Sequence, residues 1–178
     1  GISATSISIA DIDGDSHKDL ITSVFNLQRA LGGEMLGGSD LADRDVTVFW
    51  GYNGQFSKLN NTSLNAPYTV STAVADLDGD GKNDIICATH QDETRFTTES
   101  KIFWGDGKRQ FRESEQGITS HGAYHVAVIP ALTDEGLPYV VVSNAKFGSL
   151  REEVPLIIYY GSAEGFDEAN VTKIPFRS

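Results

Sequence analysis

The stretch Ala75–Ile86, ADLDGDGKNDII, contains four aspartates at positions 1, 3, 5 and 9 counted from Asp76, and an apolar run begins directly after the last of them. A second stretch near the start of the sequence, Ala10–Ile21, reads ADIDGDSHKDLI and spaces its four aspartates in the same way. One acidic loop could occur by chance. Two loops with the same internal spacing indicate a repeated structural unit.

The chain contains three such units. Aligning Asp11 with Asp76 matches SISIADIDGDSHKDLITSV with STAVADLDGDGKNDIICAT, and a third copy, HVAVIPALTDEGLPYVVVSN, aligns without a gap when Ala131 is placed on Asp76. This third copy keeps the apolar pattern but loses the four aspartates. An aromatic residue, a glycine and then a phenylalanine follow each copy: Trp50-Gly51 with Phe56, Trp104-Gly105 with Phe111, and Tyr160-Gly161 with Phe166. These landmarks recur at a nearly constant spacing, and the first unit has extra residues between Phe25 and Val46.

Each unit is predicted to form four short strands. Apolar, β-branched runs bounded by Asp and Gly, such as Val126–Ile129, are typical of buried strands, and no segment shows a persuasive helical period. The order in each unit is strand, acidic turn, strand, variable loop, strand with an aromatic-glycine end, and a short last strand. Four antiparallel strands make a propeller blade. We therefore predict an all-β fold, a single β-propeller segment over residues 1–178 with three blades at about 3–60, 69–114 and 123–170.

These residues resemble the FG-GAP or VCBS-type repeats of integrin α-like β-propellers, whose signature is a DxDGDGxxD turn followed by an apolar strand. The first two acidic loops carry most of the resemblance, and the third unit shares only the apolar pattern and the segment from Tyr160 to Phe166. The Phe-Gly and Gly-Ala-Pro letters of the family name do not occur in this sequence. Propellers of this kind usually have about seven blades, so the resemblance implies an open ring. Further blades are then expected in the same chain or in another one.

The acidic loops are predicted to bind two calcium ions. Calcium takes six to eight oxygen ligands, and carboxylates at alternate positions of a tight turn can converge on one ion. The carbonyl of the residue at position 7 supplies a further oxygen. The predicted ligands of the first loop are Asp11, Asp13, Asp15, the carbonyl of His17, and Asp19. Those of the second loop are Asp76, Asp78, Asp80, the carbonyl of Lys82, and Asp84. The corresponding positions of the third unit are Ala131, Thr133, Glu135 and Tyr139, and no calcium is expected there.

Other interpretations of the loops are less favoured. An EF-hand needs a glutamate at position 12, where this chain has Thr22 and Cys87. Zinc prefers His and Cys, and His17 is the one such residue inside the loops. A metal-free pair of Asx turns is the simplest alternative, although crowded carboxylates without a cation repel one another. A catalytic metal would keep an open coordination position, whereas a repeated and nearly filled shell favours a structural ion.

The loops at the opposite ends of the strands, 26–45, 89–100 and 144–154, differ most among the units and could form a binding surface. Arg95, Phe96, Phe147 and Arg151 combine aromatic and polar groups that suit sugars or peptides. Packed or solvated loop residues are the alternative for each of them. The aromatic residues Trp50, Trp104 and Tyr160 are expected to serve blade packing rather than a sugar platform.

The net charge and the amino-acid composition argue against some classes of binding partner. The chain has 178 residues and a formal net charge of −11, which two bound calcium ions would bring to about −7. This charge argues against nucleic acid and anionic membranes as partners, and no window approaches the length of a membrane span. Cys87 is the single cysteine, so no internal disulfide can form, and a buried unreactive thiol is expected. Because the sequence begins at Gly1 and runs directly into a strand pattern, we expect an excerpt or a processed product.

The leading hypothesis is a non-catalytic, calcium-stabilised propeller module of an extracellular, cell-surface or periplasmic protein. The resemblance implies recognition of an extracellular protein or a carbohydrate in adhesion. Two alternatives remain. The segment could be the accessory, substrate-binding propeller of a secreted polysaccharide-degrading enzyme, or it could be a spacer between other domains.

Overall fold

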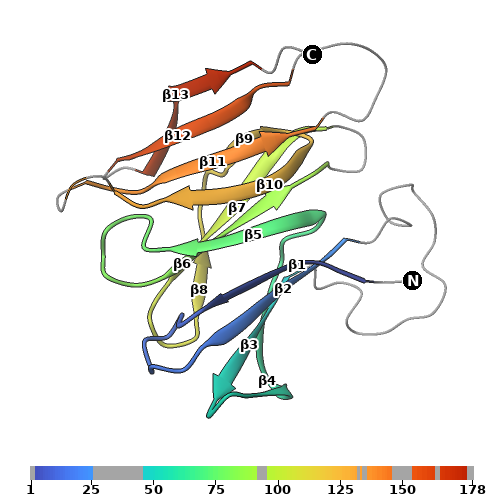
Figure 1. The fold of residues 1–178 in the computed structure, drawn as a ribbon, viewed down its shortest axis with the longest axis vertical. Helices are drawn as coiled ribbons and strands as arrows, with labels where there is room; N and C mark the ends of the chain where they lie inside the picture. Colours follow the sequence, from blue (N-terminus) through green and yellow to red (C-terminus); the bar gives the residue numbers. More distant parts are fainter. Residues whose placement is uncertain are drawn as a thin grey trace.

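A computed structural model describes residues 3–25, 46–91, 96–131, 133, 136–145, 154–162 and 165–175. The regular secondary structure of these residues is entirely β-strand and forms three antiparallel sheets (Figure 1). The sheets follow one another along the long axis of the molecule, from the first at the bottom of the view to the third at the top.

The strands of each sheet are adjacent in the order in which they occur in the chain. The first sheet consists of β1 (Ser3–Ala10), β2 (Asp19–Phe25), β3 (Val46–Tyr52) and β4 (Gln55–Leu64). The second consists of β5 (Thr69–Ala75), β6 (Asp84–Thr89), β7 (Thr97–Gly105) and β8 (Phe111–Glu113), with β9 (Ile118–His121) also paired to β7. The third consists of β10 (Ala123–Ile129), β11 (Tyr139–Asn144), β12 (Leu156–Ser162) and β13 (Gly165–Ile174).

This architecture confirms the predicted all-β fold of three propeller blades, each with four antiparallel strands. The three sheets do not close into a ring, which is consistent with a partial propeller. The outer edge of the second sheet differs from the simple repeat. Its fourth strand is divided, because β8 pairs with the end of β7 and β9 pairs with the beginning of β7. In the first and third sheets one long strand, β4 or β13, pairs along the third strand instead.

The apolar core lies between the sheets. Every residue of β6 is buried, and alternate side chains of a strand point to opposite faces. Ile85 and Cys87 accordingly pack in the cluster shared with the first sheet, whereas Ile86 and Ala88 pack in the cluster shared with the third. Burial raises the pKa of the Cys87 thiol far above its ordinary value, so this cysteine is an unreactive core residue.

The first strands of the three sheets also lie beside one another. β5 lies against β1 and β2, and β10 lies against β5 and β6. Hydroxyl groups join these strands, since Ser8 Oγ donates to the Thr72 carbonyl at 2.8 Å and Ser71 Oγ lies 2.9 Å from His125 Nδ1. This stacking fixes the loops between the first two strands of neighbouring sheets at the same edge of the molecule. We name these the first loop (11–18), the second loop (76–83) and the third loop (130–138).

The aromatic-glycine pair at the end of each third strand has a steric explanation. A Cβ atom at Gly51 would lie 2.0 Å from the carbonyl oxygen of Lys18, and one at Gly105 would lie 2.2 Å from that of Asn83. Each glycine therefore allows the end of the acidic loop to approach the backbone of the third strand. Beside the first of these glycines, Trp50 is 2% exposed and stacks on Phe111 of the second sheet, as expected for a packing residue.

Candidate metal centres

The first carboxylate of each acidic loop is held at the centre of the turn by backbone amides. Asp76 Oδ2 accepts a hydrogen bond from Gly81 N at 2.9 Å, and Asp11 Oδ2 accepts one from Ser16 N at 3.0 Å. Gly81 has a φ of 81°, and Ser16 adopts the same left-handed conformation with a φ of 70°. The first loop therefore keeps the shape of the second loop although a serine replaces the glycine.

The next two aspartates of each loop form Asx turns. Asp13 Oδ1 accepts from Asp15 N at 3.2 Å, and Asp15 Oδ1 accepts from His17 N at 2.8 Å. The second loop repeats this pattern from Asp78 to Asp80 N at 3.1 Å and from Asp80 to the amide of the residue at position 7 at 2.9 Å. Each of these bonds uses one carboxylate oxygen and leaves the other for a different partner.

The last aspartate of each loop is a buried tether. Asp84 is 1% exposed; its Oδ2 accepts from Leu77 N at 2.8 Å and its Oδ1 from Gly105 N at 2.9 Å. Asp19 is fully buried and makes the same two contacts, with Ile12 N at 2.8 Å and Gly51 N at 2.9 Å. Each of the two carboxylates thus joins its own loop to the end of the third strand.

Burial changes the pKa values of these two tethering carboxylates. It raises the pKa of Asp84 to about 6 and raises the pKa of Asp19 above its usual value, although the two amide donors oppose the shift in each case. Nearby aspartates of the same loop add to the effect. A cation beside the loop would favour the charged form of these groups.

Three carboxylates of each loop converge. Within the described residues, the groups whose oxygen atoms lie within 4.8 Å of one another are Asp11, Asp13 and Asp15 in the first loop, and Asp76, Asp78 and Asp84 in the second. Among the same residues, Asp11 Oδ1 is buried and has no hydrogen-bond partner. An all-oxygen donor set with an unsatisfied buried oxygen could hold a hard divalent cation, and it fits calcium.

Two segments of the chain match a known repeat family. Residues 34–87 and residues 76–142 each match the model of the FG-GAP-like repeat. The chain belongs to the FG-GAP-like repeat family. No curated protein matches the chain significantly. FG-GAP-like repeats typically occur in extracellular or surface proteins and are generally non-catalytic. The described residues contain no helix long and apolar enough to cross a membrane.

The two matched segments show how the FG-GAP-like repeat relates to the sheets. The first segment ends at Cys87 in β6, and the second ends at Val142 in β11. Each match therefore begins before the last strands of one sheet and ends in the second strand of the next sheet. The second loop lies within both matched segments, whereas the first loop (11–18) precedes both.

The third loop of this FG-GAP-like chain has a different local chemistry. Tyr139 stands where the other loops have Asp19 and Asp84, and its ring packs edge-on against Tyr160 at 4.9 Å. Ala131 and Thr133 replace two further aspartates, and Glu135 lies outside the described residues. The described part of the third loop contributes no residue to the converging carboxylate groups.

The predicted ligand residues on the opposite loops are only partly described. Arg95, Phe147 and Arg151 lie outside the described residues. Phe96 is half-buried, its ring meets His90 edge-on at 5.6 Å, and its carbonyl accepts a hydrogen bond from Gly122 N. These contacts lie within the second sheet and its connection to the third.

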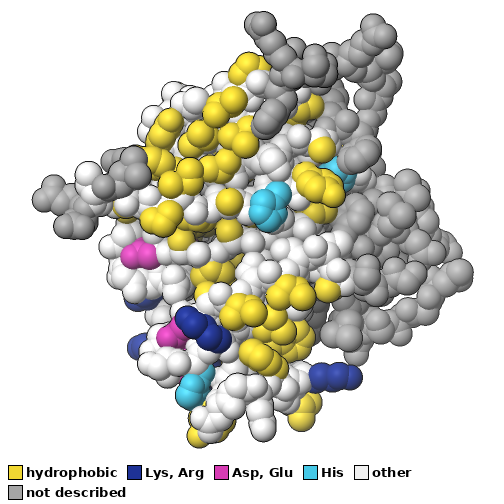
Figure 2. All heavy atoms as spheres, viewed as in Figure 1, with side chains coloured by type: hydrophobic (Ala, Val, Ile, Leu, Met, Phe, Trp, Pro, Cys, Tyr) yellow, Lys and Arg dark blue, Asp and Glu magenta, His cyan; other side chains and the backbone are white. Residues whose placement is uncertain are grey.

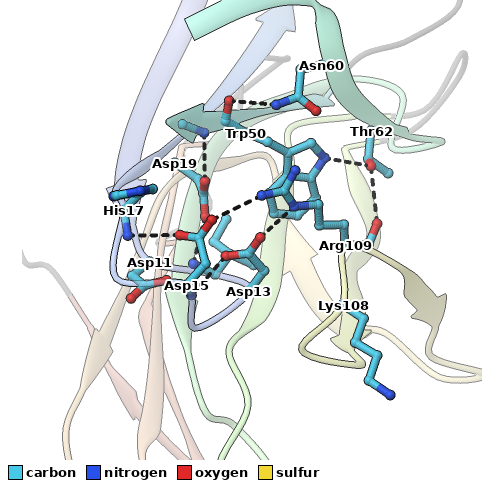
Figure 3. Close-up of polar contacts among 12 residues, drawn as sticks. Asp11, Asp13, Asp15, His17, Asp19, Trp50, Asn60, Thr62, Lys108 and Arg109 are labelled. Atoms are coloured by element: carbon cyan, nitrogen blue, oxygen red, sulfur yellow. Dashed lines mark hydrogen bonds and ion pairs between the residues drawn. The ribbon is translucent and has the colours of Figure 1, made fainter. Parts of the chain in front are cut away.

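Two residues of the second sheet that were not predicted from the sequence contact the first loop (Figure 3). Asn83 Nδ2 donates to the Asp11 carbonyl at 2.7 Å, and Arg109 forms ion pairs with Asp13 and Asp15. One feature of the sequence could have pointed to Arg109. The segment from Gly105 to Phe111 is one position longer than the corresponding glycine-to-phenylalanine segments of the first and third units. The extra position lies in the turn that carries Arg109.

Proposed function

We propose that this chain is a non-catalytic, calcium-stabilised segment of a β-propeller in an extracellular or surface protein. The observation that carries the proposal is the convergence of three carboxylates in each of two loops, with a buried, unpartnered oxygen on Asp11. Unpaired buried oxygens of this kind are costly, and a divalent cation satisfies several of them at once.

The converging carboxylates would hold the ions. Asp11, Asp13 and Asp15 would contact one ion, and Asp76, Asp78 and Asp84 the other. The assignment of Asp19, Asp80 and the carbonyls of His17 and Lys82 as further ligands stays a prediction. An ion at each place would neutralise crowded negative charge and fix the connection between the first two strands of a sheet.

A structural role for the ions is favoured over a catalytic one. The tethers at Asp19 and Asp84 fasten each loop to the third strand, so a bound ion would stabilise three strands at once. The converging groups of the described residues consist of aspartates alone. A catalytic metal would need an open coordination position and a neighbouring acid, base or nucleophile.

Calcium removal tests this proposal directly. We expect chelation with EDTA to lower the melting temperature by roughly 5–10 °C for each ion removed, because an ion at 100 times its Kd stabilises by about 2.7 kcal/mol and each kcal/mol shifts the melt of a chain this size by about 2–4 °C. Added calcium should restore the melt. Asp76→Asn should reduce the response, whereas Asp106→Asn, a matched change on an exposed turn, should preserve it. A melt that is identical with and without calcium would refute the proposal.

Ligand recognition is the less constrained part of the proposed function. Variation among the loops opposite the acidic ones supports adhesion through an extracellular protein or a glycan, with Arg95, Phe96, Phe147 and Arg151 as candidate contacts. The accessory-propeller and spacer alternatives predict different outcomes. Binding of the wild type to a panel of glycans and extracellular proteins, lost in an R95A/R151A double variant, would support recognition by these loops; no binding to any member would favour the spacer.

Further blades are proposed to cover the outer face of the first sheet. Ile7 and Ile9 in β1 are 64% and 65% exposed, while the alternating Ser6 and Ser8 face the second sheet and hydrogen-bond to Thr72. Figure 2 shows hydrophobic side chains gathered at the surface over β1 and β2 and over the third sheet. A further sheet against β1 would repeat the contact that β5 makes with β1 and β2.

Self-association through the exposed face of β1 tests the proposal that a further blade covers this face. The isolated segment is expected to associate with increasing concentration, since burying one isoleucine is worth about 1.5–3 kcal/mol. An I7S/I9S double variant should associate less in sedimentation velocity. Leu59→Ser is the control. Leu59 is 96% exposed, but it lies in β4, at the opposite edge of the first sheet from β1. Equal association of the wild type and the I7S/I9S variant would contradict the proposal.

A further inference from the structure

Arg109 crosses from the turn between β7 and β8 to the first loop of the neighbouring sheet (Figure 3). Its Nε lies 2.5 Å from Asp13 Oδ2, and its Nη2 lies 3.1 Å from Asp15 Oδ2. These are the carboxylate oxygens that the Asx turns leave unused, because the Oδ1 atoms accept the backbone amides of Asp15 and His17. The guanidinium thus binds two of the three carboxylates that converge in the first loop.

Arg109 is held in this position from several sides. The guanidinium carbon lies 5.2 Å from the centre of the Trp50 ring, which is a cation–π arrangement. The carbonyl oxygen of Arg109 accepts from Thr62 Oγ1 at 3.2 Å, and the same hydroxyl accepts from Trp50 Nε1 at 3.0 Å. The hydrogen bond to Asp13 raises the pKa of Arg109 above its usual value. These contacts fix the arginine between the first and second sheets.

The backbone of Arg109 adopts a conformation that is energetically unfavourable for a residue with a side chain. Its φ is 72°, a left-handed conformation that L side chains rarely adopt. Gly54, which also lies two positions before the phenylalanine of its unit, has a φ of 73°. A glycine would therefore suit the turn better, and the contacts with the first loop and Trp50 compensate for the arginine.

Among the described residues, the second loop receives no equivalent cation from the next sheet. The turn before Phe166 in the third sheet has Gly165, with a φ of 100°. A pocket of about 500 Å³ lies beside Asp78 and Trp104 at this junction. The ion pair of the second loop in the described part of the chain is local, between exposed Lys82 and Asp80, and Asp80 is outside the converging group.

We propose that Arg109 is a built-in counter-cation of the first loop, which makes the first loop bind calcium more weakly than the second. This inference rests on the proposed function, calcium binding by the acidic loops. A calcium ion and the guanidinium compete for Asp13 Oδ2 and Asp15 Oδ2, and their like charges repel. Because linkage is reciprocal, calcium in the first loop also weakens the hold of Arg109 on the first sheet.

Calcium titration calorimetry on single-loop variants tests the inference. Asp76→Asn disables the second loop and reports on the first, whereas Asp11→Asn disables the first loop and reports on the second. Arg109→Gln in the Asp76→Asn background should tighten calcium binding by about tenfold, the scale expected for the loss of one charged hydrogen-bonding competitor. The same change in the Asp11→Asn background should leave affinity unaltered.

A neighbouring cation provides the matched control. Lys108 is exposed on the same turn and extends away from the first loop (Figure 3). Lys108→Gln removes the same formal charge and should leave both affinities unchanged. Thermal unfolding gives a second measurement that does not depend on calcium binding. In EDTA, Arg109→Gln should lower the melting temperature more than Lys108→Gln does, because only Arg109 of the two joins the sheets.

The outcomes separate the inference from the proposed function. If the Asp11→Asn variant binds calcium while Arg109→Gln leaves the affinity of the first loop unchanged, the counter-cation role is wrong and the calcium proposal stands. If neither single-loop variant binds calcium, the proposed function fails and the inference fails with it. If Lys108→Gln tightens the first loop as much as Arg109→Gln, general charge rather than the contact geometry explains the effect, and the inference is overturned.

Discussion

The second and third loops occupy the same place in consecutive sheets, but different forces hold them. In the second loop, the buried carboxylate of Asp84 joins Leu77 N and Gly105 N. In the third loop, Tyr139 packs against Tyr160, and Leu137 lies close to the backbone at Gly161. The first two strands of the third sheet are thus connected by a loop whose described residues include no converging carboxylates. The aspartates of the second loop are therefore not a requirement for such a connection, and their converging oxygens could hold a metal ion.

The largest expected effect comes from breaking the tether of the second loop. Asp84→Ala leaves two backbone N–H groups without their acceptor, and we expect it to lower the free energy of unfolding by about 3 kcal/mol. The comparison variant is Asp80→Ala, which removes an exposed carboxylate paired with Lys82 and should cost less than about 1 kcal/mol. Urea denaturation in EDTA measures both without a contribution from calcium.

The two loop variants can also contradict the distinction between a tether and an exposed carboxylate. Equal destabilisation by Asp84→Ala and Asp80→Ala would show that the buried contacts of Asp84 contribute nothing special. A loss that appears only when calcium is present would show that the metal, rather than the hydrogen bonds to Leu77 and Gly105, holds the loop. Either result would remove the difference drawn between the second and third loops.

Much of the fold could be predicted from the sequence because its information is local and repeated. The alternation of apolar residues, the Asp-rich turns and the aromatic-glycine pairs recur in register, so the four strands of each sheet follow from one alignment. The divided edge of the second sheet could not be predicted in this way. β9 is a short strand that pairs with the beginning of β7, where the first and third sheets have one long fourth strand, β4 or β13.

The acidic loops were found from sequence, but the different roles of their aspartates were not. Spacing treats Asp19 and Asp84 as ligands like the others, because it carries no information on which carboxylate is buried against backbone amides. Arg109 illustrates a second limit. Its partners, Asp13 and Asp15, are 96 and 94 residues away, and only the packing of one sheet on another brings them together. Contacts between repeats are invisible to a method that reads one repeat at a time.

A smaller effect is expected from the glycines that face the two loops. A Cβ atom at Gly105 would lie 2.2 Å from the Asn83 carbonyl oxygen, and one at Gly161 would lie 2.7 Å from that of Pro138. Both Gly→Ala variants should destabilise, by about 1–2 kcal/mol, because the backbone must shift. Only Gly105→Ala should also weaken calcium binding, since Gly105 N donates to Asp84. Unfolding and calcium titration of the two variants test this, and equal calcium affinity in both would show that the third-strand glycine and the metal loop are independent.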